Sequence, residues 1–179
     1  MQQKIVITGG PGTGKTSLID ELSKRNYKCT PEISRQVTQQ ARKEGIEHLF
    51  LKDPLLFSKL LLEGREQQYI DALNTDETII FFDRGIPDVH AYMNHFKTEY
   101  PQTYTEKSKK YRYDSIFILP PWKEIYTTDD ERYESFDLSI SIYEHLKKAY
   151  TELDYSIIEV PFGSIDTRVD FILEQLKFL

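Results

Sequence analysis

Gly9-Gly10-Pro11-Gly12-Thr13-Gly14-Lys15-Thr16-Ser17 is the stretch that decides the fold of this chain. It follows a short apolar run at residues 4–8, which is typical of a buried strand, and it precedes residues 18–22, whose apolar spacing is helical. A glycine, four further residues and then Gly-Lys-Thr, placed between a strand and a helix, form the pattern of a phosphate-binding P-loop. The stretch therefore predicts a site for a nucleoside triphosphate.

The residue types in this loop suit that ligand. Glycines have no Cβ, so the backbone can take positive φ values and turn consecutive N–H groups toward an anion. The following helix adds unpaired N–H groups and the positive end of its dipole. We expect Lys15 to reach the β- and γ-phosphates, Thr16 to bind Mg²⁺ through its hydroxyl, and Ser17 to contact the α-phosphate. The predicted nucleotide-binding set is Gly10, Gly12, Thr13, Gly14, Lys15, Thr16 and Ser17.

Length and composition limit the class of protein. The 179 residues suit a single domain over residues 1–179, and a chain of this size buries roughly 70% of its unfolded surface. A net charge of −6 argues against a broad nucleic-acid-binding face. Cys29 is the only cysteine, which excludes an intrachain disulfide and fits a reducing compartment. With no apolar run long enough to span a bilayer and no signal peptide, we expect a cytoplasmic protein without a membrane span.

Strand-like and helix-like segments alternate along the rest of the chain. Further strands are expected at residues 27–30, 78–82, 115–119 and 156–160, so the sheet has five strands. Asp53 is expected to cap a long helix whose apolar stripe includes Leu55 and Leu56, and Ser164 is expected to cap the last helix. This alternation predicts an α/β fold, a three-layer α/β/α domain with a five-stranded parallel sheet.

Asp83 and Arg84 directly follow the strand expected at residues 78–82, so they lie at the carboxyl edge, where ligands bind in open α/β sheets. If this strand lies beside the first one, the Asp83 carboxylate can complete the Mg²⁺ site with Thr16 through a metal-bound water. Arg84 can contact a phosphate or an acceptor. The alternatives are a carboxylate that caps the next helix and an arginine in a surface ion pair.

Three other charged residues are candidates at the same edge. Glu32, expected just past Pro31 in the first turn of a helix, can orient or deprotonate an acceptor hydroxyl, although a glutamate also suits a helix start for dipole reasons. Arg35 can bind an acceptor anion or pair with Glu32. Arg132 lies in a polar segment, about residues 121–135, that is expected to form a lid and to bring positive charge to the γ-phosphoryl group on closure.

The region after residue 83 is rich in aromatic residues, which either stack on a nucleobase-like acceptor or are half-buried packing. These are Tyr92, Phe96, Tyr100, Tyr104, Tyr111 and Tyr113. A basic cluster follows in the same region, and it is either a solvated face or a contact for anions or lipid headgroups. It comprises Lys107, Lys109, Lys110 and Arg112.

Taken in order, these motifs resemble a known group over nearly the whole chain. Gly9 to Ser17, the run from Pro31 to Arg35, Asp83-Arg84, the Asp130-Glu131-Arg132 loop and Val160-Pro161 are similar to the compact P-loop ATPase/kinase family. That family includes the ribosylnicotinamide kinase domain of the bacterial NAD regulator and the Ttd14-type proteins of animals, and it is related to deoxynucleoside and thymidylate kinases. The resemblance implies an acceptor-orienting acid at Glu32, an acid-arginine pair at Asp83 and Arg84, and a lid arginine at Arg132. It also implies that residues 161–164 border the adenine.

Two functions follow. The first is an ATP- and Mg²⁺-dependent kinase that transfers the γ-phosphoryl group to a small hydroxyl acceptor, expected to be nucleoside-like. The second is a regulatory module that binds ATP or GTP, hydrolyses it slowly and binds a partner or a lipid headgroup. A Ras-like GTPase is disfavoured because no Asn-Lys-x-Asp stretch is present, and a ring-forming AAA+ motor because the chain has no length for a further helical domain. The sequence predicts no particular acceptor or oligomeric state.

Overall fold

The computed structural model describes residues 2–126 and 135–178. Within these residues the sheet consists of five parallel strands, as the alternating pattern predicted, and their order is β2-β3-β1-β4-β5. The strands are β1 (Gln3–Gly9), β2 (Lys28–Cys29), β3 (Ile79–Asp83), β4 (Ser115–Leu119) and β5 (Ile157–Glu159). Ile7 of β1 is in register with Asp83 of β3, so the end of the P-loop strand and the end of β3 lie at the same edge.

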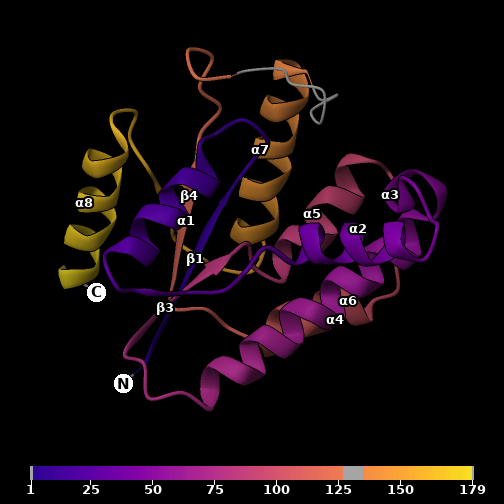
Figure 1. Cartoon of the computed structure of the whole chain (residues 1–179), viewed down its shortest axis with the longest axis horizontal. Coiled ribbons are helices and arrows are strands. Elements are labelled where there is room, and N and C mark those ends of the chain that lie inside the picture. Colours follow the sequence, from indigo (N-terminus) through magenta and orange to yellow (C-terminus); the bar gives the residue numbers. More distant parts are fainter. Residues whose placement is uncertain (1, 127–134, 179) are drawn as a thin grey trace.

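Helices cover both faces of this sheet (Figure 1). They are α1 (Lys15–Lys24), α2 (Ile33–Lys43), α3 (Leu49–Lys52), α4 (Pro54–Leu73), α5 (Pro87–His95), α6 (Thr103–Lys110), α7 (Phe136–Thr151), α8 (Ile165–Gln175) and the 3₁₀ turn η1 (Leu176–Phe178). In Figure 1, α1 and α8 lie together on one side, and α2, α4, α5 and α6 lie on the other. This is the predicted three-layer arrangement.

Alternation along β1 divides the core between the two faces. Ile5 and Ile7 pack with Leu18 of α1 and Val169 of α8, whereas Val6 belongs to the cluster on the opposite face. Successive side chains of a strand point to opposite faces, so a central strand with helices on both sides must be apolar throughout. The continuous apolar run at residues 5–7 meets that requirement.

Helix boundaries follow local signals. The Asp53 side chain accepts a hydrogen bond from Leu56 N, and the Ser164 side chain accepts one from Thr167 N, so both predicted caps are present. Helix α2 begins at Ile33, and Glu32 is its N-cap residue, so the expected start at Pro31 was early. Helices α3, α5 and α6 were not predicted.

The buried face of α4 differs from the predicted stripe. Leu55 and Leu56 are exposed, and the buried positions include Leu61, Leu62 and Arg65. The predicted stripe contains only apolar and aromatic residues, whereas the helix turns the cationic side chain of Arg65 inward, which hydrophobic periodicity does not reveal. This inward arginine becomes part of the site described below.

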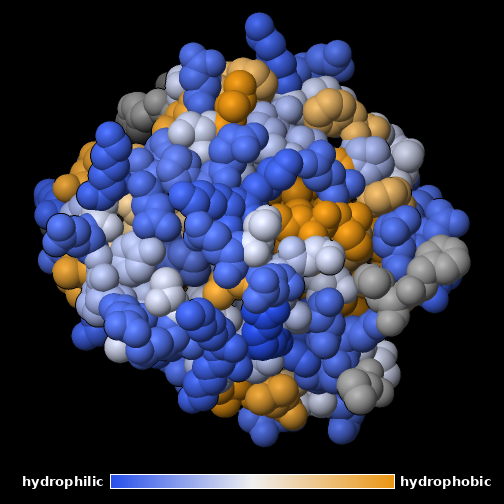
Figure 2. Space-filling model, turned by 180° about the vertical axis from the view of Figure 1, so that it is seen from behind, coloured by the Kyte–Doolittle hydropathy of each residue, from blue (hydrophilic) through white to orange (hydrophobic). Residues whose placement is uncertain are grey.

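Charged residues make up 29% of the chain, and residues of this kind lie mostly at protein surfaces. Seen from the side opposite to that of Figure 1, hydrophilic residues dominate and surround an apolar hollow (Figure 2). Among the described residues, no helix combines the length and the apolar character needed to cross a membrane.

Candidate active site

A cavity of about 800 Å³ opens at the carboxyl edge of the sheet. The P-loop forms its middle. The start of α8 and the segment after β4 line one end, and α2, α4 and α5 line the other. All seven residues of the predicted nucleotide-binding set line this cavity. The fold therefore brings the phosphate-binding loop and a second, adjoining chamber into one continuous space.

The P-loop has the backbone that its glycines predicted. Gly12 and Gly14 have φ angles of 72° and 80°, in the left-handed region where a side chain is disfavoured. Gly14 is also the N-cap residue of α1, so the unpaired N–H groups of that helix begin at the loop. The Thr13 hydroxyl donates to Gly10 O at 2.9 Å, while Thr16 and Ser17 are exposed at the cavity. This arrangement fits an anion held by backbone N–H groups.

Lys15 and Asp83 form an ion pair in this structure. Burial lowers the pKa of Lys15, and the nearby Arg84 charge lowers it further, against the opposing effect of Asp83 and Glu32. The Asp83 backbone N–H donates to Thr30 Oγ1 at 3.2 Å, which fixes the end of β3. Lys15, expected at the β- and γ-phosphates, and Asp83, expected at the Mg²⁺ site, therefore lie together. The joint binding of Mg²⁺ by Thr16 and Asp83 stays a prediction.

Arg84 follows Asp83 in a left-handed backbone conformation, with a φ of 72°. Its Nη1 donates to Gly9 O at 2.9 Å and to Asp88 Oδ1 at 3.3 Å, and its Nε lies 3.8 Å from Glu32 Oε1. A non-glycine residue with this φ is uncommon and is held in place by its surroundings. The side chain is not in a surface ion pair, the simpler of the two readings, because it is buried in the cavity wall.

Glu32, the N-cap residue of α2, lies beside Arg84, and both side chains line the cavity. Its carboxylate accepts a hydrogen bond from Ser34 Oγ at 2.9 Å. Burial alone would raise the pKa of Glu32, but the charges of Lys15 and Arg84 outweigh that effect and lower it. Glu32 is therefore ionised at neutral pH and can accept a proton. Arg35 lines the same chamber and forms no ion pair with Glu32 among the described residues.

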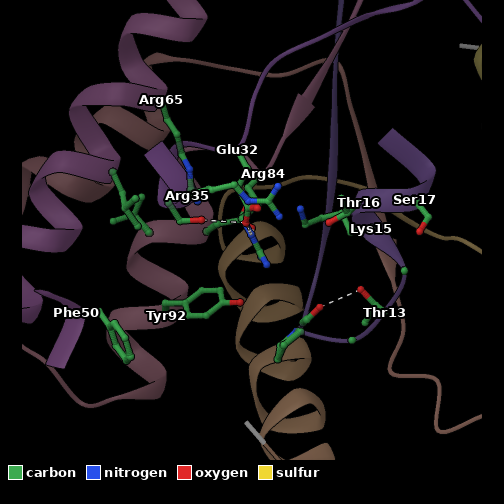
Figure 3. Close-up of a pocket in the computed structure, with 18 of the residues that line it drawn as sticks. Thr13, Lys15, Thr16, Ser17, Glu32, Arg35, Phe50, Arg65, Arg84 and Tyr92 are labelled. Atoms are coloured by element: carbon green, nitrogen blue, oxygen red, sulfur yellow. Dashed lines mark hydrogen bonds and ion pairs between the residues drawn. The ribbon is translucent and has the colours of Figure 1, made fainter. Parts of the chain in front are cut away.

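Figure 3 shows how these side chains are grouped. Lys15, Thr16 and Ser17 lie on the P-loop side of the view, and Glu32, Arg84 and Arg35 come together beside them, with Arg65 above (Figure 3). Tyr92 and Phe50 mark the outer wall of the adjoining chamber. The charged groups are thus concentrated near the P-loop, and the chamber beyond them is mostly apolar. Its apolar lining includes Phe50, Phe57, Leu61, Val89, Met93 and Phe96.

Asp88 is a site residue that sequence reasoning missed. It is fully buried at the start of α5 and accepts hydrogen bonds from Thr8 Oγ1 and Tyr150 Oη, each at 2.5 Å, and from Gly85 N at 3.1 Å. Burial would raise the pKa of Asp88, but the charges of Arg65 and Arg84 outweigh that effect and lower it. The sequence does carry one signal for this position, because Pro87-Asp88 is a helix-start pattern and Asp88 lies four residues after Arg84.

Arg65 was also missed. Its side chain is 3% exposed, its Nη1 donates to Gly85 O at 3.0 Å, and its Nε has no hydrogen-bond partner. It lines the adjoining chamber from α4. A buried arginine that lies at the helical spacing of apolar neighbours cannot be distinguished in the sequence from an exposed one.

The other end of the cavity is aromatic. Trp122 stacks on Phe162 with 5.0 Å between ring centroids, and Arg168 of α8 lies over the Trp122 ring at 5.8 Å. Gly163 and Ser164, within the loop that the resemblance placed at the adenine, line this end. The lid candidate Arg132 lies outside the described residues, as do residues 127–134 of the expected lid segment.

The aromatic residues and the basic cluster that follow β3 have different surroundings in the structure. Tyr104, Tyr111 and Tyr113 are buried packing, whereas Tyr92 and Phe96 line the cavity. In the basic cluster, Lys107 pairs with Glu66, Arg112 donates to Leu153 O at 2.6 Å, and Lys110 lies 4.7 Å from the Tyr111 ring. None of the four cationic residues of the cluster is among those that line the cavity.

Comparisons with known proteins agree with this geometry. Residues 4–168 match the AAA domain family, so the chain belongs to that family. No protein of curated function matched the chain by sequence. Many solved structures share its fold, and three examples are each at most 20% identical to this chain.

The first of these is deoxyadenosine kinase from M. mycoides, with a TM-score of 0.70 and 18% identity over 99% of this chain and 100% of that one. NadR in complex with NR has a TM-score of 0.75 and 19% identity over 99% of this chain and 51% of that chain. Thymidylate kinase from Candida albicans has a TM-score of 0.66 and 20% identity over 99% and 92% of the two chains. The chain thus has the nucleoside-kinase-like P-loop fold that the sequence predicted.

Proposed function

We propose that this protein is a Mg²⁺-dependent kinase that transfers the γ-phosphoryl group of ATP to a hydroxyl of a small, nucleoside-like acceptor. The observation that carries the proposal is the continuity of one cavity from the P-loop to a chamber with an ionised carboxylate, Glu32, at the junction. A site that only held a nucleotide would not need a second chamber. The structural likeness to two nucleoside or nucleotide kinases and to NadR supports the same class of reaction.

In this mechanism the acceptor hydroxyl lies between Glu32 and the γ-phosphoryl group. Its oxygen forms the new bond to phosphorus as the bond to the β–γ bridging oxygen breaks, ADP leaves, and the hydroxyl proton passes to Glu32. Lys15 moves from Asp83 to the phosphates, and Arg84 holds Glu32 in place and adds positive charge nearby. Bound Mg²⁺ would neutralise phosphate charge, with Thr16 and Asp83 as the residues to hold it.

Release of ADP from Mg-ATP tests the proposal, measured across a panel of nucleosides that includes nicotinamide riboside. An acceptor that stimulates turnover by wild-type protein but not by Lys15→Ala would support a kinase, with Lys24→Ala, an exposed lysine of the same helix, as the matched control. Tight nucleotide binding with no stimulation by any acceptor would contradict the proposal and favour the regulatory module. Nothing described at the basic cluster, which lies outside the cavity, specifically favours that second function.

Glu32 has a sharper test. Glu32→Gln keeps the shape of the side chain but removes its ability to take a proton, so kcat should fall by roughly 10²- to 10⁴-fold while the affinity for ATP is nearly unchanged. Glu44→Gln, at the opposite end of the same helix, should leave both unchanged. Equal losses of turnover and of ATP affinity in Glu32→Gln would remove Glu32 from the acceptor side of the site.

A further inference from the structure

Arg168 is a charged residue that none of these roles has used. It lies in the first turn of α8, with a side chain only 3% exposed. Its Nη2 donates to Thr13 O at 3.0 Å, and a Cβ on Gly14 would lie only 2.9 Å from its Nη1. The guanidinium is therefore pressed against the part of the P-loop where the phosphate-binding N–H groups begin.

The charge of Arg168 has no counter-ion within the described part of the chain, where no carboxylate lies within ion-pair distance of it. Its Nε is buried without a hydrogen-bond partner, and burial lowers its pKa. Arginine nevertheless stays protonated in proteins. By contrast, the buried Arg84 faces both Glu32 and Asp88.

An uncompensated buried charge is strongly unfavourable, and proteins normally pair it or bind an ion against it. The position of Arg168 indicates which ion. It contacts Thr13 and Gly14, where the loop is built for phosphate. Its guanidinium also lies over the ring of Trp122, which stacks on Phe162, and such aromatic faces suit a base. A polyanion in the P-loop would supply the missing negative charge.

We propose that Arg168 binds the donor nucleotide, and that the phosphate chain of that nucleotide is its counter-ion. The inference rests on the nucleotide site of the proposed function but not on the acceptor or on turnover. In this role the Arg168 guanidinium adds a fixed cation to the P-loop from the C-terminal helix, in addition to Lys15. The hydrogen bond from its Nη2 to Thr13 O also holds the loop in the conformation that receives the phosphates.

Calorimetric titration of the purified protein with Mg-ADP tests this without any turnover. We expect Arg168→Gln to weaken ADP binding by about 10- to 100-fold, the effect of removing one charge-assisted contact. Arg168→Lys keeps the charge without the planar fork, so it should recover part of the affinity. Because added salt screens charge, the salt dependence of ADP affinity should become shallower in Arg168→Gln than in wild type.

Arg25→Gln is the matched control. Arg25 also joins α1 to α8, through hydrogen bonds to Glu21, Asp166 and Asp170, but it does not line the cavity. The Arg25→Gln variant should therefore keep the wild-type affinity for ADP. If Arg25→Gln loses as much ADP affinity as Arg168→Gln, the loss comes from weaker packing of α8 on α1, and the proposal is wrong. Unchanged ADP affinity in Arg168→Gln, or a loss with an unaltered salt dependence, also overturns the proposal.

Two outcomes separate this proposal from the function on which it rests. If wild-type protein does not bind Mg-ADP, the nucleotide site itself fails. If wild-type protein binds Mg-ADP and Arg168→Gln binds it equally well, the nucleotide site stands and the proposed role of Arg168 is wrong. Should Arg168→Gln not fold, Arg168→Lys decides alone, because it retains the charge: a reduced affinity with a wild-type salt dependence supports the proposal, and a wild-type affinity contradicts a role for the guanidinium fork.

Discussion

Replacing Asp88 by asparagine changes one oxygen atom at the centre of the buried network. Oδ1 of Asp88 accepts from Thr8 Oγ1 and Arg84 Nη1, and Oδ2 accepts from Gly85 N and Tyr150 Oη. An amide has one accepting oxygen, so its NH₂ group must face one of these pairs of donors. The hydroxyl in either pair can turn to accept instead, but Arg84 Nη1 and the Gly85 N–H cannot. In one orientation of the amide the Gly85 N–H therefore loses its acceptor, and in the other Arg84 Nη1 keeps only Gly9 O as an acceptor.

The magnitude follows from the burial of the network. Asp88 is fully buried, and its charge offsets those of the buried Arg84 and Arg65. Removing one partner of a buried ion pair costs about 3–5 kcal/mol. Tyr150→Phe deletes only one hydrogen bond to the carboxylate, and we expect it to cost about 1.5–3 kcal/mol. A domain of this kind has roughly 5–15 kcal/mol of stability, so losses of this size are large enough to measure and leave the protein folded over most of that range.

Urea unfolding followed by circular dichroism measures these losses at pH 7. With a urea dependence of about 1–3 kcal/mol per molar, Asp88→Asn should lower the midpoint by at least about 1 M. Tyr150→Phe, measured at the same urea dependence, should lower the midpoint by a smaller amount than Asp88→Asn. Asp76→Asn, at an exposed position, should change the free energy of unfolding by no more than about 0.5 kcal/mol. Equal midpoints for Asp88→Asn and Asp76→Asn would refute the account of the network.

The pH dependence gives an independent check on the charge of Asp88. Because the pKa of Asp88 is lowered from its ordinary value of 3.8 in the folded protein, its contribution to stability is fully present above pH 3.8. That contribution is lost as the pH falls through the lower, folded pKa. The difference in the free energy of unfolding between wild type and Asp88→Asn should therefore shrink in acid. If the difference in the free energy of unfolding between wild type and Asp88→Asn stays constant from pH 7 to below pH 3.8, the charge of Asp88 is not what stabilises the network.

Three further predictions concern two glycines and a helix cap. Gly12→Ala should weaken ADP binding at least about 10-fold in a calorimetric titration, because the left-handed conformation costs a side chain about 1–2 kcal/mol and a Cβ would collide with the Tyr126 ring. Gly64→Ala should lower the urea midpoint, since crowding against Ile33 at 2.7 Å costs about 1–3 kcal/mol and exceeds the gain of up to about 1 kcal/mol in helix propensity. Asp53→Ala should cost about 1 kcal/mol in the same assay, through loss of the α4 cap. Unchanged values would contradict each account.

Local patterns predicted much of this fold. The P-loop, the five strands and the caps at Asp53 and Ser164 depend on residues close in sequence, and the structure has all of them. The strand that ends at Asp83 was expected beside the first strand, and β3 does lie beside β1; the ion pair of Asp83 with Lys15 was not predicted. These features need only short-range chemistry and simple topology.

The parts that could not be predicted depend on contacts between distant segments. Asp88 and Tyr150 are far apart in sequence, and a buried hydrogen bond joins them. Arg65 and Arg168 look like ordinary helix-surface arginines until α4 and α8 pack against the sheet. Leu55 and Leu56 were placed in the core because they are apolar, although the packing of α4 left them exposed. Burial of a charged group depends on its tertiary partners, which periodicity does not report.

The two ends of the cavity differ in how their charges are balanced. On the acceptor side, Arg84 and Arg65 are offset by Glu32 and Asp88, and the charge of the exposed Arg35 is screened by solvent. That balance suits a neutral alcohol better than an anionic acceptor, because an anion would have to compete with carboxylates already in place.

On the donor side, Lys15 can leave Asp83 for phosphate, and Arg168 has no carboxylate partner among the described residues. A polyanion gains most where positive charge is least compensated. The distribution of charge therefore favours the triphosphate at the Arg168 end and the hydroxyl acceptor at the Glu32 end, which is the direction of transfer that the proposed kinase requires.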